Sequence, residues 1–340
     1  MKPTDFAGYL TGFLSSYLPG QRNLSKHTIQ SYRDTFQLLL TFCRDVCKIP
    51  IEKITLGQID KGLVEDFLVW LETDRGNSIS TRNQRLAALH SFFRYVQFEA
   101  PETMLHCQRV LGIPFKKKPK PAITHLTADE IRAIFEGPDT SKKDGRRDLL
   151  LLSLLYDTGG RVSEISDLEV RDVRLDSPAT ITLNGKGGKI RYVPIMSKTA
   201  DLLSVYLHEQ HLLEHSRLEN PLFFNRQKRK LTRMGVTYVL DKYVELARTK
   251  CPSMPEKVTP DSFRHSKAMH LLESGVNLVY IRDLLGHSSV MTTEIYARAN
   301  AEMKRKALEQ AHVNLIPVHA DEPAWEDDSS LVSWLQNLCR

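Results

Sequence analysis

Three polar side chains in the segment 258–300 combine a permanent charge, an imidazole and a phenol: Arg264, His287 and Tyr296. A tyrosine hydroxyl is a weak nucleophile until a base or an electric field activates it. An arginine fork matches the oxygens of a phosphate, and its charge stabilises the negative charge that grows when a phosphodiester is attacked. Each residue also has an ordinary interpretation, as a core tyrosine, a histidine at a helix end and a surface arginine. The pattern therefore predicts phosphodiester chemistry only if further residues join these three.

Glycines and cap residues divide this segment into helices. Gly275 and Gly286 are typical of helix C-termini, and Asn277 and either Ser288 or Ser289 are candidate N-caps. These signals predict helices over about 260–274, 278–285 and 289–298. The arginine would then lie early in the first helix, the histidine just after the second and the tyrosine late in the third.

A second arginine follows a predicted buried helix. Residues 149–156 are almost continuously apolar, which is too dense for a surface helix, and two glycines end the run just before Arg161. An arginine fixed at such a turn needs an anionic partner. That partner is either Glu164 or Asp167 in a structural salt bridge, or an anionic substrate, and the sequence leaves both open.

A glycine-rich turn joins two predicted antiparallel strands over 179–195. The strands are indicated by alternating apolar residues, Ile181 with Leu183 and Ile190 with Tyr192. The turn 184–189 carries Lys186 and lacks the spacing and the strand-to-helix context of a P-loop. This lysine is either solvated or able to swing toward a substrate as a proton donor or a phosphate ligand.

Five motifs, taken in order, resemble those of the tyrosine recombinases, the phage integrase family. They are TGGRVSE with Arg161, GKGGK with Lys186, TPDSFRH with Arg264, LLGH with His287 and TTEIYAR with Tyr296. The resemblance extends from about residue 24 to 311. It implies that these five residues are catalytic and that Glu164 supports the first arginine.

The resemblance also implies the reaction. Tyr296 would attack DNA to form a 3′-phosphotyrosyl link, and Lys186 would protonate the departing 5′-hydroxyl. His287 would donate a hydrogen bond to the phosphate. Because the link stores the energy of the broken bond, we expect no metal ion, ATP or other cofactor.

One position departs from the family pattern, which normally reads His-x-x-Arg where this chain has Asp261 three residues before Arg264. The aspartate either pairs with Arg264 or caps a helix that begins near Ser262, or is protonated and donates to the phosphate, or restrains the enzyme until a partner completes the site. We favour the structural interpretation. The neighbouring His265 is a candidate for compensation, although its helical position predicts that it points elsewhere.

Residues 1–113 are predicted to form a helical domain, which the resemblance implies is a core-binding domain that contacts DNA. A first helix would end at Pro19-Gly20, and a long helix would open at Leu24-Ser25 with an apolar stripe of Ile29, Tyr32, Phe36, Leu39, Leu40 and Cys43. Segment 54–71 would hold one or two further helices. Ser80 would cap another helix, whose inward residues are Leu86, Leu89, Phe93 and Val96.

Basic and polar residues that lie off these apolar stripes are candidates for DNA binding. A charged helix face is usually only solvated, so this prediction rests on the domain's place before a catalytic domain. The candidates are Lys26, His27, Arg33, Arg82, Asn83 and Arg85, together with Lys116, Lys117 and Lys118 of the linker.

The remaining chain divides by composition. A Pro/Lys linker over 114–124 separates the first domain from a catalytic domain over 125–312, which opens with a capping box at 127–130. The basic run 226–233 either touches the DNA backbone or is a solvated loop. The tail 313–340 is an acidic linker followed by a helix with an apolar face of Leu331, Trp334, Leu335 and Leu338, which docks either on its own domain or on a neighbouring protomer.

Composition agrees with a DNA-binding enzyme. The 340 residues carry a net charge of +6, with positive charge on both predicted domains and an acidic tail. We expect a mainly α protein with a small antiparallel β-sheet. Five scattered cysteines predict reduced thiols and a cytoplasmic location, with no metal site, membrane span or signal peptide.

The predicted partner is double-stranded DNA with inverted-repeat recombination sites. The resemblance implies a DNA-bound tetramer, formed by this chain alone or together with related recombinases. The tetramer would integrate, excise or transpose a mobile element. Two alternatives stay open from the sequence. One is a type IB-like topoisomerase with similar chemistry, and the other is a DNA-binding regulator that has lost cleavage.

Overall fold

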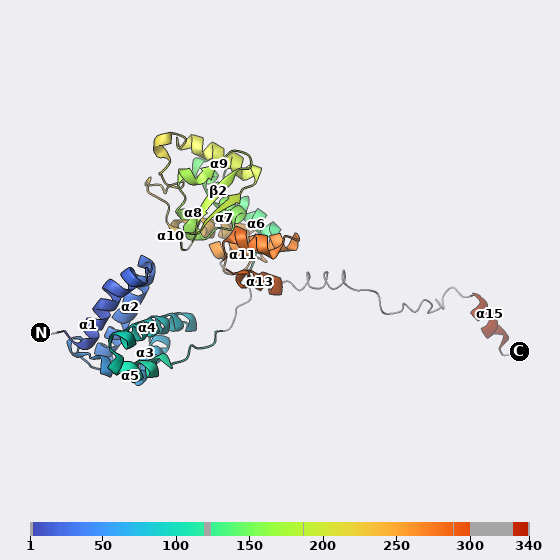
Figure 1. Ribbon diagram of the computed structural model, residues 1–340. Coiled ribbons are helices and arrows are strands. Elements are labelled where there is room, and N and C mark those ends of the chain that lie inside the picture. The colour runs from blue at the N-terminus through green and yellow to red at the C-terminus, as the bar shows by residue number, and fades with distance from the viewer. Residues whose placement is uncertain (1–2, 119–123, 186, 288, 300–328, 339–340) are drawn as a thin grey trace. The chain divides into compact units, whose positions relative to one another are not determined.

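The computed structural model describes residues 3–118, 124–185, 187–287, 289–299 and 329–338. The chain folds into two compact units, Met1–Pro121 and Ala122–Arg340 (Figure 1), and their division lies inside the segment 114–124. The units are mainly helical, and the second contains a small antiparallel sheet, as the sequence predicted.

The first unit is a helical bundle around aromatic side chains. Phe13, Phe36 and Phe92 are fully or almost fully buried and meet edge to face in its core. Short 3₁₀ turns connect the main helices. The main helices are α1 (Asp5–Gly12), the π-helical η1 (Phe13–Gln21), α2 (Lys26–Asp45), α3 (Lys61–Thr73), α4 (Ile79–Glu99) and α5 (Met104–Leu111).

Two predicted helix ends in this unit were wrong. The first helix does not end at Pro19, because η1 carries the chain through it to Gln21 while Leu18 is fully buried. The N-cap of α4 is Ser78, whose hydroxyl accepts from the Thr81 N–H, and not Ser80. The predicted start of α2 at Leu24-Ser25 is confirmed, with Ser25 as its N-cap, and so are the predicted apolar faces of α2 and α4.

Arg82 was expected on an outward face and is instead buried, with 6% of its surface exposed. Its guanidinium donates to the carbonyl of Pro114 at 3.2 Å, and the amide of Asn83 donates to the carbonyl of Lys116 at 2.8 Å. Arg85 donates to the carbonyl of Ser31 at 3.0 Å. The polar face of α4 therefore ties this helix to α2 and to the chain at 114–116.

The second unit is built around α7, whose run Leu150–Leu152 is fully buried. This helix packs against α9 and α11. Further helices and three strands in the order β1-β2-β3 complete the unit. The helices are α6 (Ala128–Phe135), α7 (Lys143–Thr158), α8 (Val162–Ser166), α9 (Ser197–Glu209), α10 (Arg233–Arg248), α11 (Pro260–Glu273), α12 (Leu278–Leu285), α13 (Val290–Ala299) and α15 (Ser329–Asn337).

The sheet is antiparallel and its strands are β1 (Val173–Arg174), β2 (Thr180–Asn184) and β3 (Ile190–Pro194). On β2 the predicted alternation is confirmed, because Ile181 and Leu183 are fully buried. On β3 the prediction that Ile190 and Tyr192 form the inward face was wrong, since these residues are 59% and 73% exposed. The inward residues of β3 are Val193 and Arg191, which stand opposite Ile181 and Leu183. β1 has two residues, too few to show an alternation.

Candidate active site

The helices α11, α12 and α13 begin and end close to the predicted positions. Asn277 accepts from the Val279 N–H at 2.9 Å, and Ser289 accepts from the Met291 N–H at 3.2 Å. Gly286 ends α12 in the left-handed conformation with φ of 65°. Leu272, Leu285 and Tyr296 belong to one buried cluster between α11, α12 and α13. This packing brings the polar residues at the helix ends together.

Arg264 on α11 is buried and joins two helix C-termini. Its guanidinium donates to the carbonyl of Gly159 at 2.7 Å, at the end of α7, and to that of Leu285 at 2.6 Å, at the end of α12. Burial, followed by the positive charge of Arg161, lowers the pKa of Arg264 to about 10. It therefore stays charged at neutral pH, and it fixes the ends of the helices that lead into Arg161 and His287.

Glu164 holds the second arginine. It accepts from the Arg161 guanidinium at 2.9 Å and from the Arg161 backbone N–H at 2.8 Å. Arg191 on β3 donates to the same carboxylate at 2.6 and 3.1 Å. Burial alone would raise the pKa of Glu164, but the hydrogen bonds from Arg191 and Arg161 lower it. The predicted structural salt bridge thus exists, yet the Arg161 side chain is still 38% exposed.

A cavity of about 440 Å³ opens beside these groups. Its wall includes Arg161, Lys189, Arg191, Gly286 and His287, so positive side chains outnumber the one acidic residue of the wall, which is on α12. Such a cavity favours an anion. Lys186, on the hairpin turn, lies outside the described residues.

His287 lies between this cavity and Tyr296. Its Nδ1 is 2.9 Å from the hydroxyl of Thr293, and its ring stacks on that of Tyr296 with centroids 6.5 Å apart. Burial, and then the charges of Arg264 and Arg161, lower the pKa of His287 to about 4. The imidazole is therefore neutral at pH 7 when no anion is bound.

Tyr296 is 1% exposed, and its hydroxyl lies 2.8 Å from Nδ1 of His265. The expectation that His265 points elsewhere was wrong. It projects from α11 in a different direction from Arg264, but α13 packs against α11 and supplies Tyr296 on that side. Burial raises the pKa of the Tyr296 hydroxyl, so the group stays protonated at neutral pH.

Comparisons with known proteins agree with this geometry. Residues 124–303 match the model of the "Phage integrase family", and residues 10–99 match the "Phage integrase, N-terminal SAM-like domain". The putative integrase/recombinase y4rC of Sinorhizobium fredii is 37% identical over 338 residues, 99% of each chain. The tyrosine recombinase XerC of Pelotomaculum thermopropionicum is 32% identical over 302 residues, 87% of this chain and 95% of its own.

The chain belongs to the phage integrase family. It is a tyrosine-type, site-specific DNA recombinase that acts through a covalent DNA–tyrosine intermediate. Two solved structures share its fold. XerH in a pre-cleavage complex on difH has a TM-score of 0.64 and 24% identity over 88% of this chain and 84% of its own. The Tn1549 transposon integrase on circular intermediate DNA has a TM-score of 0.66 and 14% identity over 87% of this chain and 98% of its own.

Asp261 of this recombinase neither caps a helix at Ser262 nor pairs with Arg264 among the described residues, although its place in the first turn of α11 suits the helix dipole as expected. The helix begins earlier than Ser262, because Thr259 is the N-cap and Pro260 occupies the first helical position. Asp261 is exposed in the first turn and, within the described residues, makes no ion pair with Arg264. Its charge reaches the active site all the same, since it raises the pKa values of both His265 and Tyr296.

Arg191 is a residue of this recombinase that the sequence interpretation missed. It bridges Glu164 and the carbonyl of Leu284, to which it donates at 2.8 Å, so it connects the sheet, α8 and α12. The signal for it was present, because Arg191 alternates with Val193 on the inward face of β3. A charged residue at an inward strand position indicates a buried ionic partner.

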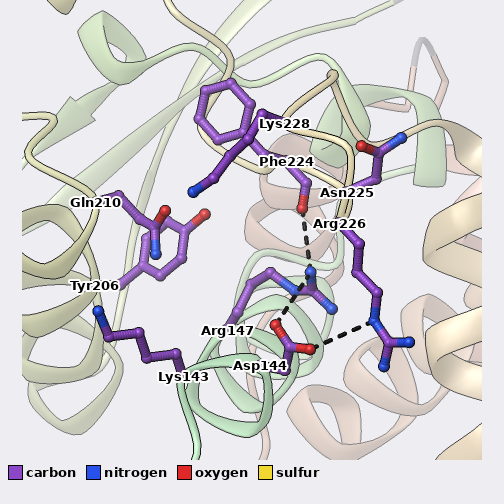
Figure 2. A pocket seen from close by; sticks show the side chains of 9 residues that line it. All are labelled: Lys143, Asp144, Arg147, Tyr206, Gln210, Phe224, Asn225, Arg226 and Lys228. Atoms are coloured by element: carbon purple, nitrogen blue, oxygen red, sulfur yellow. Dashed lines mark hydrogen bonds and ion pairs between the residues drawn. The ribbon is translucent and has the colours of Figure 1, made fainter.

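A second cavity of the recombinase, of about 220 Å³ and shown in Figure 2, shares no lining residue with the first. It is lined by Tyr206, Arg147 and Arg226 among others, and Arg147 donates to the carbonyl of Phe224 at 3.2 Å. Arg226, the first residue of the basic run 226–233, pairs with Asp144 at 3.5 Å. The arginines of this cavity are thus engaged with the protein itself, and none of the proposed catalytic residues lines it.

No helix in the described part of the recombinase combines the length and apolar character needed to cross a membrane.

Proposed function

We propose that the recombinase cleaves DNA with Tyr296 as nucleophile while Arg161, Arg264 and His287 bind the scissile phosphate. The observation that carries this proposal is the arrangement of these groups. Arg264 fixes the chain next to Arg161 and next to His287, and His287 stacks on Tyr296. Planar guanidinium groups suit the non-bridging oxygens of a phosphodiester.

The step is a transesterification at phosphorus. A bond forms between the Tyr296 oxygen and phosphorus, and the bond from phosphorus to the 5′-oxygen breaks. Lys186 gives a proton to the departing 5′-hydroxyl, and a 5′-hydroxyl of another strand later reverses the step. Tyr296 is almost fully buried, so DNA binding must open the packing around its hydroxyl before attack.

Bound phosphate would also change His287. The pKa of this histidine is low because of burial and nearby arginine charges. A phosphate anion in the cavity neutralises part of that positive field and so raises the pKa of His287. His287 then donates a hydrogen bond to the phosphate.

The proposed partner is double-stranded DNA with inverted-repeat sites, on which four copies exchange strands. XerH is known on a palindromic difH substrate, and lambda integrase as a dimer on a core site. In the first unit, Lys26, His27 and Arg33 are exposed, as are Lys116, Lys117 and Lys118, and these six are the proposed DNA contacts. By analogy with the Tn1549 transposon integrase, we propose that the recombinase moves a mobile element.

Covalent capture tests this proposal. DNA that is covalently linked to the protein in cells is recovered and sequenced, and a nicked duplex carrying that site is then used as a suicide substrate. Wild-type protein is expected to form an adduct at Tyr296, and Tyr296→Phe is expected to bind the duplex and form none. An adduct of undiminished yield in the variant would refute the nucleophile.

Strand exchange between two such sites distinguishes a recombinase from a topoisomerase and from a DNA-binding regulator. A topoisomerase would relax DNA without exchange, and a regulator would bind without an adduct. Only a recombinase yields joined products from two separate duplexes.

A further inference from the structure

The hydroxyl of Tyr296 has a single hydrogen-bond partner among the described residues, and that partner is His265. The distance from Oη to Nδ1 is 2.8 Å, and the two rings are tilted by 55° with centroids 5.7 Å apart. His265 comes from α11 and Tyr296 from α13, which pack against each other. The contact is therefore fixed by helix packing before any DNA is present.

We propose that His265 is the general base of the cleavage step and accepts the phenolic proton of Tyr296 at Nδ1. This inference rests on the proposed nucleophile and deepens it. The aspartate one turn earlier, Asp261, stabilises the imidazolium that forms. His265 is thus a catalytic residue, because it touches the reacting atom.

The protonation state of His265 suits a base. Burial lowers its pKa below the ordinary value of 6.5, so the imidazole is neutral at neutral pH. In the tautomer that carries its proton on Nε2, Nδ1 has a free lone pair and accepts the hydrogen bond of the Tyr296 hydroxyl. The groups that shift its pKa come from α11 itself and from neighbouring parts of the unit. Asp261 raises its pKa, Arg264 and His125 lower it, and Tyr296 and His287 complete its titratable surroundings.

The other groups near the tyrosine are poorer acceptors. Arg264 is a cation that already donates to two carbonyls. His287 lies over the face of the Tyr296 ring, and its Nδ1 is engaged with Thr293. Among the described residues, His265 is the one whose ring nitrogen is within hydrogen-bond distance of the hydroxyl.

The proton balance closes over a full cycle. As the Tyr296 oxygen bonds to phosphorus, its proton passes to His265, and the 5′-oxygen leaves with a proton from the general acid. When a 5′-hydroxyl attacks the phosphotyrosyl link, the deprotonated general acid takes the proton of that hydroxyl, and the imidazolium of His265 returns its proton to the departing tyrosine. No oxidant, reductant or metal ion takes part in these transfers.

A matched control exists on the same helix. His270 also places Nδ1 at 2.8 Å from a tyrosine hydroxyl, that of Tyr156, and burial lowers its pKa too. His270→Ala therefore removes an equivalent part-buried contact that does not involve Tyr296. A purely structural role of His265 predicts that His265→Ala and His270→Ala have equal effects.

The experiment is single-turnover cleavage of the nicked duplex by both variants. His265→Ala is expected to slow cleavage by about 10²-fold or more, the usual contribution of a general base. His270→Ala is expected to lose comparable stability and to cleave at the wild-type rate. If His265 merely latches Tyr296 in its buried position, His265→Ala cleaves as fast as wild type or faster, and the proposal is overturned.

A second arm changes the nucleophile and not the base. A fluorinated tyrosine at position 296 is more acidic, so it needs less help to lose its proton. The defect of His265→Ala is expected to shrink markedly with fluorotyrosine, whereas a positioning defect would persist unchanged. An adduct formed by Tyr296→Phe would refute Tyr296 as the nucleophile. A wild-type cleavage rate in His265→Ala, together with an inactive Tyr296→Phe, would refute only the assignment of His265 as the general base.

Discussion

The guanidinium of Arg191 lies directly against the α-carbon of Gly286. A Cβ at Gly286 would stand 2.9 Å from Nη1 of Arg191 and 3.2 Å from its Cζ. The glycine is also required by its backbone, since φ there is 65°. One residue thus ends α12, turns the chain toward His287 and leaves room for the arginine that binds Glu164.

Gly286→Ala is expected to destabilise the recombinase and to slow cleavage. The left-handed backbone costs an alanine about 1–2 kcal/mol, and the new methyl group displaces Arg191. Gly275→Ala is the control, because Gly275 has φ of 81° and nothing within 4 Å of its would-be Cβ. Thermal unfolding should show a loss in both variants, and single-turnover cleavage a loss in Gly286→Ala alone. Equal cleavage would mean that Arg191 is free to move aside.

Glu164 should make the stability of the recombinase sensitive to acid. Its pKa is lowered in the folded state, despite burial, by hydrogen bonds from Arg191 and Arg161. A lowered folded pKa contributes stability that is fully present above the unfolded value of 4.5 and is lost as pH falls through the folded value. Glu164→Gln should therefore be less stable than wild type at pH 7, and the difference in stability should narrow as pH falls from 4.5 through the folded pKa. Chemical denaturation across pH 3–7 measures this, and a difference constant with pH would contradict the ionic role.

Arg161→Lys and Arg264→Lys should both bind DNA and cleave it poorly. A lysine keeps the charge but cannot reproduce the planar fork. The two variants should differ in stability, because Arg264 is buried and donates to the carbonyls of Gly159 and Leu285. Arg161 is part-exposed, so its replacement should unfold at nearly the wild-type temperature. Near-normal adduct formation by both variants would assign the arginines a structural role only.

The tail should matter for assembly and not for binding of a single site. Trp334 and Leu335 of α15, and Leu338 directly after it, are 58%, 53% and 58% exposed. So short a helix gains little stability alone, and we expect it to dock on a neighbouring protomer. Deletion of 318–340 should weaken cooperative assembly on paired sites, as measured by gel mobility shift, while the affinity for one site is kept. Unchanged assembly would exclude docking in trans.

Local signals predicted the helices of the site well, because caps and glycines act within one turn. Asn277 and Gly286 are examples, since the first caps α12 and the second ends it as predicted. What failed was the direction of side chains that depend on tertiary packing. Arg82 is turned inward by the carbonyl of Pro114, and His265 meets Tyr296 only because α13 crosses α11. No periodicity within one element contains that information.

Asp261 offers the sharpest remaining test, because its charge and its place in the helix have separable effects. It stands in the first turn of α11, where a negative charge suits the helix dipole by about 0.3–1 kcal/mol. Asp129 occupies the same position on α6 and serves as the control. Asp261→Asn and Asp129→Asn should lose similar, small amounts of stability.

Cleavage should separate the two variants. Asp261 raises the pKa of His265, so Asp261→Asn lowers it and leaves a weaker base. The acid limb of the pH–rate profile should then move to lower pH, because His265 is neutral over a wider range, while the maximal rate falls. Asp129→Asn should leave the profile unchanged. If Asp261→Asn changed neither the pH of the acid limb nor the maximal cleavage rate, the carboxylate would have no electrostatic role at the site. If it abolished cleavage at every pH while the protein stayed folded and bound to DNA, Asp261 would itself take part in the chemistry.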